Sequence, residues 1–201
     1  MAVSICILLL FLNNSAAQST ATVYTPKGTP VTVLVLAEAS QSQISSWNAQ
    51  ATAAFPNATI VSNSSAKYNC HGYAWYLTEC AGCTQYWMNT PGDDKYWQDC
   101  SYVEVSASQA QKISYASDDH SAVKSVVAGK YESKWGSWPV MRHNPTDTPY
   151  DETTLKYYIK PSLSGPSNFC TTGNFSVVAP SGTSVTWSVN PSSAATFPSG
   201  S

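Results

Sequence analysis

The order in which two residue patterns follow one another constrains the fold of this 201-residue chain more than any other feature. Residues 70–79 carry apolar side chains at helical spacing, and Asn69 immediately before them is a suitable helix N-cap. From residue 101 onward the pattern changes to short runs that are typical of strands. These runs are residues 102–105, 121–127, 131–135, 140–143 and 155–159. Helices followed by antiparallel strands predict an α+β fold.

Three further elements are expected before residue 70. Residues 31–36 form a continuous apolar run that predicts a short buried strand, and residues 58–61 predict another after the turn at Pro56. Between them, residues 40–54 are polar and alanine-rich, with larger apolar side chains at helical spacing. This segment is interpreted as a surface helix.

The composition narrows the class of protein. Charged residues make up 11% of the chain, whereas about 25% is usual in globular proteins. The net charge of −2 provides no basic surface for a phosphate backbone, so nucleic acid is not an expected partner. A hydrophobic content of 43%, with 12% aromatic residues, excludes intrinsic disorder. Since the polar residues are mainly Ser, Thr and Asn, the composition is typical of a secreted, β-rich protein.

The first 17 residues resemble a signal peptide. Residues 5–12 form an apolar run, and the small residues Ser15, Ala16 and Ala17 follow it as a cleavage site would require. The run is shorter than the roughly 20 residues that span a bilayer. These features predict a secreted or cell-surface protein without a membrane span. The first four residues lack Lys and Arg, which leaves a buried N-terminal segment as the alternative.

The C-terminal part differs in character from what precedes it. Residues 160–166 contain two prolines and one glycine, as a linker would. Two short strand-like runs follow, with Cys170 before them and Trp187 in the second, as in the opening strands of an immunoglobulin-like sandwich. We therefore expect one domain over residues 18–160 and part of an Ig-like β domain over residues 161–201. Cys170 is expected to form no disulfide with any cysteine before residue 160.

Cys70 is the strongest candidate for a reactive side chain. It lies where the predicted helix begins, and the N–H groups and dipole of a helix N-terminus stabilise a thiolate. His120 follows at the start of a predicted strand, and a helix-borne Cys facing a strand-borne His is the arrangement of papain-like catalysis. The alternative is that Cys70 is half of a disulfide or a small core residue.

Two short segments carry a resemblance to a known group of enzymes. Residues 69–74 (Asn-Cys-His-Gly-Tyr-Ala) resemble the nucleophile segment of NlpC-type and CHAP-type cysteine peptidases and amidases. Residues 119–123 (Asp-His-Ser-Ala-Val) resemble their general-base strand, and residues 133–136 with the Ig-like tail are similar to exported bacterial proteins. The resemblance implies a papain-like domain with an antiparallel sheet, and hydrolysis of peptide or amide bonds in cell-wall peptides. It implies no cofactor and no metal.

The resemblance also implies roles for individual residues. Cys70 would attack the carbonyl carbon as a thiolate, and His120 would take the thiol proton and return it to the leaving amine. The backbone N–H of Cys70 is one expected oxyanion donor, and Tyr68 is a second unless its ring only packs. A further residue would orient His120 from the next strand. The candidates are Glu132, then Ser133, with His143 or Asn144 as second choices.

His71 departs from the family pattern, in which a small residue usually follows the nucleophile. We interpret it as a structural histidine that faces solvent. Cys80 and Cys83 lie three residues apart, and a disulfide from Cys100 to one of them would restrain the Trp-rich loop. Four thiolates that include Cys70 are the zinc-binding alternative.

A second class of function remains compatible with the sequence. Trp87 and Trp97 lie in a polar loop, where they would either join the core or line a groove for sugar or peptide stacking. The chain would then be a non-catalytic surface binding module or adhesin, with Ig-like repeats and a structural Cys70. In the hydrolase interpretation the partner is a peptide or peptidoglycan-like substrate.

Overall fold

The computed structural model describes residues 19–117, 119–165, 173–179 and 184–188. The expected signal peptide and Cys170 lie outside these residues. The strands in chain order are β1 (Ser19–Tyr24), β2 (Pro30–Val35), β3 (Thr59–Ser62), β4 (Val103–Glu104), β5 (Lys112–Tyr115), β6 (His120–Lys124), β7 (Tyr131–Lys134), β8 (Val140–His143), β9 (Leu155–Ile159), β10 (Ser162–Ser164) and β11 (Ser176–Val178). The helical elements are α1 (Gln41–Ala54), η1 (Gly72–Tyr76), η2 (Leu77–Glu79) and α2 (Lys95–Gln98).

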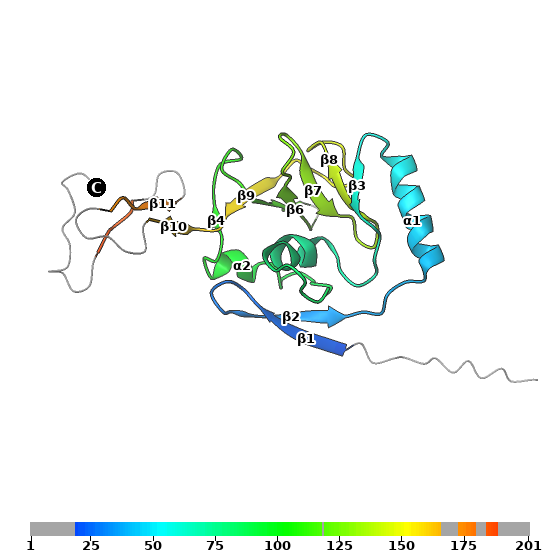
Figure 1. Cartoon of the computed structure of the whole chain (residues 1–201), viewed down its shortest axis with the longest axis horizontal. Coiled ribbons are helices and arrows are strands. Elements are labelled where there is room, and N and C mark those ends of the chain that lie inside the picture. Colours follow the sequence, from blue (N-terminus) through cyan, green and yellow to red (C-terminus); the bar gives the residue numbers. More distant parts are fainter. Residues whose placement is uncertain (1–18, 118, 166–172, 180–183, 189–201) are drawn as a thin grey trace, which may run out of the picture.

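Seven of the strands form one sheet in the order β3-β8-β7-β6-β5-β9-β4, with every neighbouring pair antiparallel. The chain is therefore a mixed α and β protein with a large antiparallel sheet, as the order of patterns predicts. The helical segment 70–79 and the β1–β2 hairpin lie below the sheet in Figure 1, and α1 lies beside β3.

The local pattern predicts several elements closely. Strands β8 and β9 have the expected bounds, and α1 begins after Ser40, whose hydroxyl accepts a hydrogen bond from the backbone N–H of Gln43. Strands β1 and β5 were not expected. The pattern of β5 is obscured because the buried Lys112 occupies a core-facing position, where it is neutralised by Glu79 at 2.7 Å.

The two faces of the sheet bury different hydrophobic clusters. The first face carries Val123 and Tyr158, which pack with Trp75 from the helical segment and with Val31 and Val33 from the hairpin. The second face carries a cluster that consists of Ile113, Tyr115, Ala122 and Tyr131. Because successive strand residues point to opposite faces, the side chains of β6 alternate between the first and the second face of the sheet.

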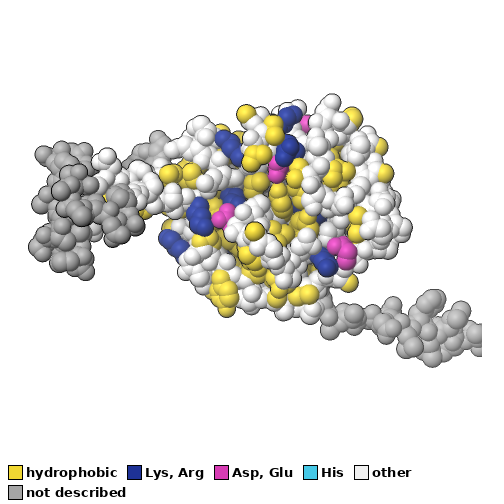
Figure 2. Space-filling view, viewed as in Figure 1, with side chains coloured by type: hydrophobic (Ala, Val, Ile, Leu, Met, Phe, Trp, Pro, Cys, Tyr) yellow, Lys and Arg dark blue, Asp and Glu magenta, His cyan; other side chains and the backbone are white. Residues whose placement is uncertain are grey.

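The outer surface and the C-terminal strands complete the fold. Few charged side chains appear on the face shown in Figure 2, where hydrophobic side chains run through the middle.

Strands β10 and β11 pair with each other in a separate two-stranded sheet, and β10 lies inside the segment interpreted as a linker. Within the described ranges, no helix has the length and apolarity needed to cross a membrane.

Candidate active site

Cys70 lies at the start of the helical segment and lines a cavity of about 470 Å³. Its side chain is mostly buried, with 6% exposed, and it forms no disulfide. The other residues that line this cavity are Asn69, His71, Trp87, Asn89, Thr90, Asp119, Gly136 and Tyr150. An unpaired thiol therefore borders a space whose walls are polar and aromatic.

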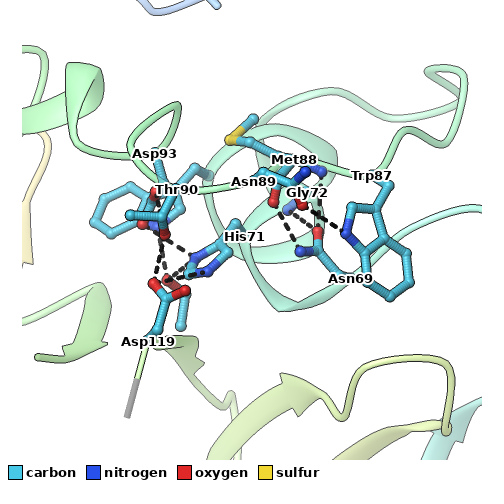
Figure 3. Close-up of polar contacts among 11 residues, drawn as sticks. Asn69, His71, Gly72, Trp87, Met88, Asn89, Thr90, Asp93 and Asp119 are labelled. Atoms are coloured by element: carbon cyan, nitrogen blue, oxygen red, sulfur yellow. Dashed lines mark hydrogen bonds and ion pairs between the residues drawn. The ribbon is translucent and has the colours of Figure 1, made fainter. Parts of the chain in front are cut away.

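Two neighbours of Cys70 explain how the helix begins at this point. The Asn69 side chain accepts hydrogen bonds from the backbone N–H groups of Gly72 and Met88, both at 3.1 Å, and donates one to the Met88 carbonyl at 2.7 Å (Figure 3). Asn69 is thus the N-cap that the sequence predicts, and it also ties the helix to the Trp87–Asn89 strand-like segment. A Cβ atom on Gly72 would collide with the Tyr86 carbonyl oxygen, so only glycine fits there.

His71 does not face solvent, which corrects the expectation from the sequence. It is buried, and its Nδ1 lies 2.9 Å from Ser121 Oγ and 3.1 Å from Asp93 Oδ2. Its Nε2 lies 3.5 Å from Asp119 Oδ1 (Figure 3). Thr90 joins the same group, because its hydroxyl bonds to Asp93 and Asp119. The sequence shows only that His71 follows Cys70, whereas its partners come from two separate segments, around Asp93 and around residues 119–121.

The surroundings of His71 favour its protonated form. Burial by itself would lower the pKa of this ring, but the interactions with Cys70 and with Asp93 outweigh it and raise the pKa to about 11. Of these, the charge of a Cys70 thiolate has the largest raising effect. At neutral pH the His71 ring is therefore a cation beside the Cys70 sulfur.

His120 begins β6, as expected, and lies on the second face of the sheet. It pairs with Tyr115 across the ladder and stacks on Tyr150 with ring centroids 3.4 Å apart and planes 9° apart. The next residue, Ser121, points to the first face and accepts a hydrogen bond from Trp75 Nε1 at 2.9 Å. His71 interacts directly with Cys70, whereas His120 lines the neighbouring cavity together with His71.

The ring of His120 is 1% exposed, and neither of its nitrogens has a hydrogen-bond partner among the described residues. Burial, followed by the positive charges of His71 and His143, lowers the pKa of His120 well below its usual 6.5. A second cavity, of about 290 Å³, is lined by His120 together with His71, Thr90 and Asp119. The same three residues line the Cys70 cavity, so the two spaces share a wall.

None of the four candidates for orienting His120 bonds to it. Glu132 lies on the first face and binds Arg142 Nε at 2.9 Å, Ser125 Oγ at 2.7 Å and the Tyr73 hydroxyl at 3.3 Å. Ser133 lies on the second face but bonds to His143 Nε2 at 3.0 Å. His143 Nδ1 is bonded to the Asn144 carbonyl at 2.7 Å, and the Asn144 side chain accepts from Lys130.

Tyr68, the expected second oxyanion donor, is 3% exposed and lies behind the Cys70 segment. The Lys134 ammonium sits 4.9 Å from the centre of the Tyr68 ring and donates to the carbonyls of Ser65 and Gly136 at 3.0 and 2.6 Å. Burial lowers the pKa of Lys134 to about 7, against the opposing charges of Cys70 and Glu38. No local sequence pattern indicates that Lys134 is buried.

The disulfide differs from the expected one. Cys80 is joined to Cys83, with Cα atoms 5.6 Å apart, and Cys100 is exposed and unpaired. The cause of this pairing is local. Gly82 adopts a φ of 79°, and the resulting turn of the chain brings Cys83 to Cys80. The four-thiolate zinc site is therefore not assembled, because two of its sulfurs are bonded to each other.

Among the described residues, one group has the composition of a metal site: His71, Asp93 and Asp119, whose ligand atoms lie within 4.8 Å of one another. A histidine binds a metal through the lone pair of a neutral ring. The contacts of His71 with Asp93 and Asp119, at 3.1 and 3.5 Å, have the lengths of ion pairs. The group is an ion-pair network in which His71 and Asp93 are buried and Asp119 is exposed.

Several residues of the site were not identified from the sequence. No sequence pattern indicates a role for Asp93 or Tyr150, and Ser121 enters only as a member of the 119–123 segment. One signal pointed toward them: His71 departs from the family pattern, and a histidine beside a nucleophile needs carboxylate partners when it is buried.

Comparisons with protein-family models, with curated proteins and with solved structures found no match for this chain.

Proposed function

We propose that this protein is a secreted cysteine hydrolase that cleaves peptide or amide bonds in cell-wall peptides. The observation that carries the proposal is the placement of Cys70: an unpaired thiol at the first turn of a helix, on the wall of a 470 Å³ cavity, beside a histidine. Helix N-termini and imidazolium groups are the surroundings that favour a thiolate. The cell-wall substrate rests on the resemblance of residues 69–74 and 119–123.

His120 is the acid–base residue in this proposal. A general base needs a ring nitrogen with a free lone pair. Both nitrogens of His71 face Ser121, Asp93 or Asp119, and both nitrogens of His143 are hydrogen-bonded. Of the three histidines in the chain, His120 has both nitrogens unbonded, and its lowered pKa keeps it neutral.

The reaction would proceed through a thioester. His120 takes the Cys70 thiol proton as the sulfur bonds to the carbonyl carbon of the substrate, the C–N bond breaks, and His120 passes that proton to the leaving amine. Water then attacks the thioester while His120 accepts a proton from it, the C–S bond breaks, and His120 returns the proton to the sulfur, which releases the carboxylic acid and the thiol. The Cys70 N–H belongs to the first helical turn and can donate to the oxyanion. The mechanism requires His120 to turn from Tyr150 toward the shared wall of the two cavities.

The cavity walls suit a peptide substrate. Asn69, Asn89 and Thr90 offer neutral polar groups, and Trp87 and Tyr150 offer flat apolar surfaces. Asp119 adds a carboxylate that is 68% exposed at the side chain and can face the amine of a substrate. Peptides present alternating amide groups and apolar side chains, which such walls accommodate.

The test is hydrolysis of soluble peptidoglycan peptides by the full chain, followed by mass spectrometry of the products. We expect Cys70→Ala and His120→Gln each to abolish cleavage while thermal unfolding stays close to that of the wild type. The matched control is His143→Gln, a buried histidine whose bonds go to Ser133 and Asn144, and it should retain cleavage. Cleavage by Cys70→Ala would overturn the proposal.

Trp87 supports the second candidate, a non-catalytic binding module, because its ring lines the cavity. Such a module would bind peptidoglycan peptides without cleaving them, and Cys70→Ala would bind as well as the wild type. Trp97 lines the second cavity and stacks on Tyr158 at a centroid distance of 5.2 Å. Binding without cleavage by the wild type would favour this candidate.

A further inference from the structure

His71 connects the Cys70 helix to two separate segments of the chain. Asp93 comes from the loop after Trp87, and Asp119 and Ser121 flank the first residue of β6. Asp93 and His71 each have a side chain that is only 4% exposed. Placing two charged groups in such a position costs free energy that good pairing must offset, so a network of this kind indicates a specific requirement for the charge.

The contacts of His71, which include a hydrogen bond to Cys70, favour a ring that stays protonated. Its Nδ1 faces Ser121 Oγ and Asp93 Oδ2, and its Nε2 faces Asp119 Oδ1. With acceptors at both nitrogens, the ring keeps both N–H bonds and has no lone pair for the Cys70 proton. What remains available is its positive charge, next to the sulfur on the wall of the same cavity.

We infer that His71 is the fixed charge partner of Cys70: a permanently protonated ring, held by Asp93 and Asp119, that stabilises the thiolate while His120 moves the proton. This inference rests on the proposed function and assigns the two tasks of a catalytic histidine to two different residues. His71 acts on the charge state of the nucleophile. His120 acts on the leaving group and on water.

The charged groups around His71 agree with this division. Asp93 and Asp119 face it directly, Asp94 lies nearby in the second cavity, and His120 borders that cavity from β6. The pKa of His71 is raised chiefly by Cys70 and then by Asp93. The positive charge of His71 in turn contributes to the lowered pKa of His120, which keeps the second ring neutral.

The test measures the rate of Cys70 alkylation by iodoacetamide against pH, with the modified residue mapped by mass spectrometry. In the wild type we expect Cys70 to be alkylated at about pH 6, because the thiolate is the reactive form and the charge of His71 favours it. His71→Gln should slow alkylation at about pH 6 by about tenfold or more. His71→Lys, which restores a positive charge, should recover part of the rate. The exposed Cys100 serves as an internal reference thiol in every sample.

His120→Gln separates the inference from the proposed function. It should abolish hydrolysis while leaving the alkylation profile unchanged, because a neutral ring contributes little to the thiolate. If His120→Gln moves the profile and His71→Gln does not, the inference is wrong and the proposed function stands. If wild-type Cys70 and Cys100 are alkylated equally slowly at about pH 6 and no peptide is cleaved, the proposed function is wrong as well.

A second measurement covers the case in which His71→Gln does not fold. Binding linkage is reciprocal, so removal of the thiolate must lower the pKa of His71. NMR titration of the histidine rings should therefore place the His71 transition at lower pH in Cys70→Ala than in the wild type. Equal transitions in the two proteins would overturn the inference, whatever the outcome with His71→Gln.

Discussion

The ring of His120 lies flat against the ring of Tyr150, and Tyr150 also forms part of the wall of the Cys70 cavity. One aromatic side chain therefore contacts the predicted base and also borders the cavity of the predicted nucleophile. The ladder explains why: His120 and Ser121 alternate between the two faces of the sheet, and the helical segment covers only the face of Ser121.

Tyr150 should control the protonation of His120. Because burial is the main cause of the lowered pKa of His120, Tyr150→Ala admits water and should raise that pKa toward 6.5. Tyr150→Phe keeps the stacked ring and should leave the pKa low. Ring signals followed by NMR against pH provide the measurement. A wild-type His120 that titrates near 6.5 would contradict the expected burial.

Glu132 should contribute to stability rather than to chemistry. Its carboxylate binds Arg142, Ser125 and Tyr73, and none of these groups belongs to the wall of either cavity. Glu132→Gln should lower the free energy of unfolding by about 1–2 kcal/mol and leave kcat within about tenfold of the wild type. Denaturant unfolding and peptide hydrolysis measure the two effects. A large loss of kcat at unchanged stability would instead restore the orienting role that the family pattern implies.

Asn69→Ala should destabilise the protein by about 2 kcal/mol or more. The change removes the helix cap and leaves the buried N–H and carbonyl of Met88 without partners. Asn63→Ala is the matched control, since it loses one exposed bond to Asn48 and should change stability by less than about 0.5 kcal/mol. Equal effects of the two variants in urea unfolding would be inconsistent with the capping role.

Lys134 should make stability depend on pH. Its pKa in the folded state is about 7, whereas its usual value is 10.5, so between these values the unfolded chain binds a proton that the folded chain lacks. This group therefore adds stability as the pH rises from 7 to 10.5, by up to about 1.4 kcal/mol per pH unit. The raised pKa of His71 acts in the opposite direction, because its contribution is complete below 6.5 and is lost toward about 11.

Lys134→Met isolates the first of these contributions. The difference in unfolding free energy between wild type and Lys134→Met should change in favour of the wild type as the pH rises from about 7 to about 9. Lys27→Met, at an exposed lysine, should give a curve parallel to that of the wild type. Parallel curves for both variants would mean that Lys134 keeps an ordinary pKa.

Local features of the fold could be predicted because they depend on a few consecutive residues. The Ser40 cap and the repeat after it define α1, the alternation of residues 155–159 defines β9, and Asn69 caps the Cys70 helix. The prediction of the disulfide was wrong because it depends on the path of the whole loop. The choice between Cys83 and Cys100 as the partner of Cys80 follows from how the loop turns at Gly82.

By itself, the sequence determined the order of helices and strands, the antiparallel character of the sheet, and the position of Cys70 at a helix start. Only the tertiary structure decided which histidine meets Cys70, because a side chain at a given strand position points to one face or the other according to register. It also decided that His71 is buried, since its partners Asp93 and Asp119 come from distant segments that folding alone brings together. Spacing along a chain identifies candidate residues, and long-range packing selects which of them share a cavity.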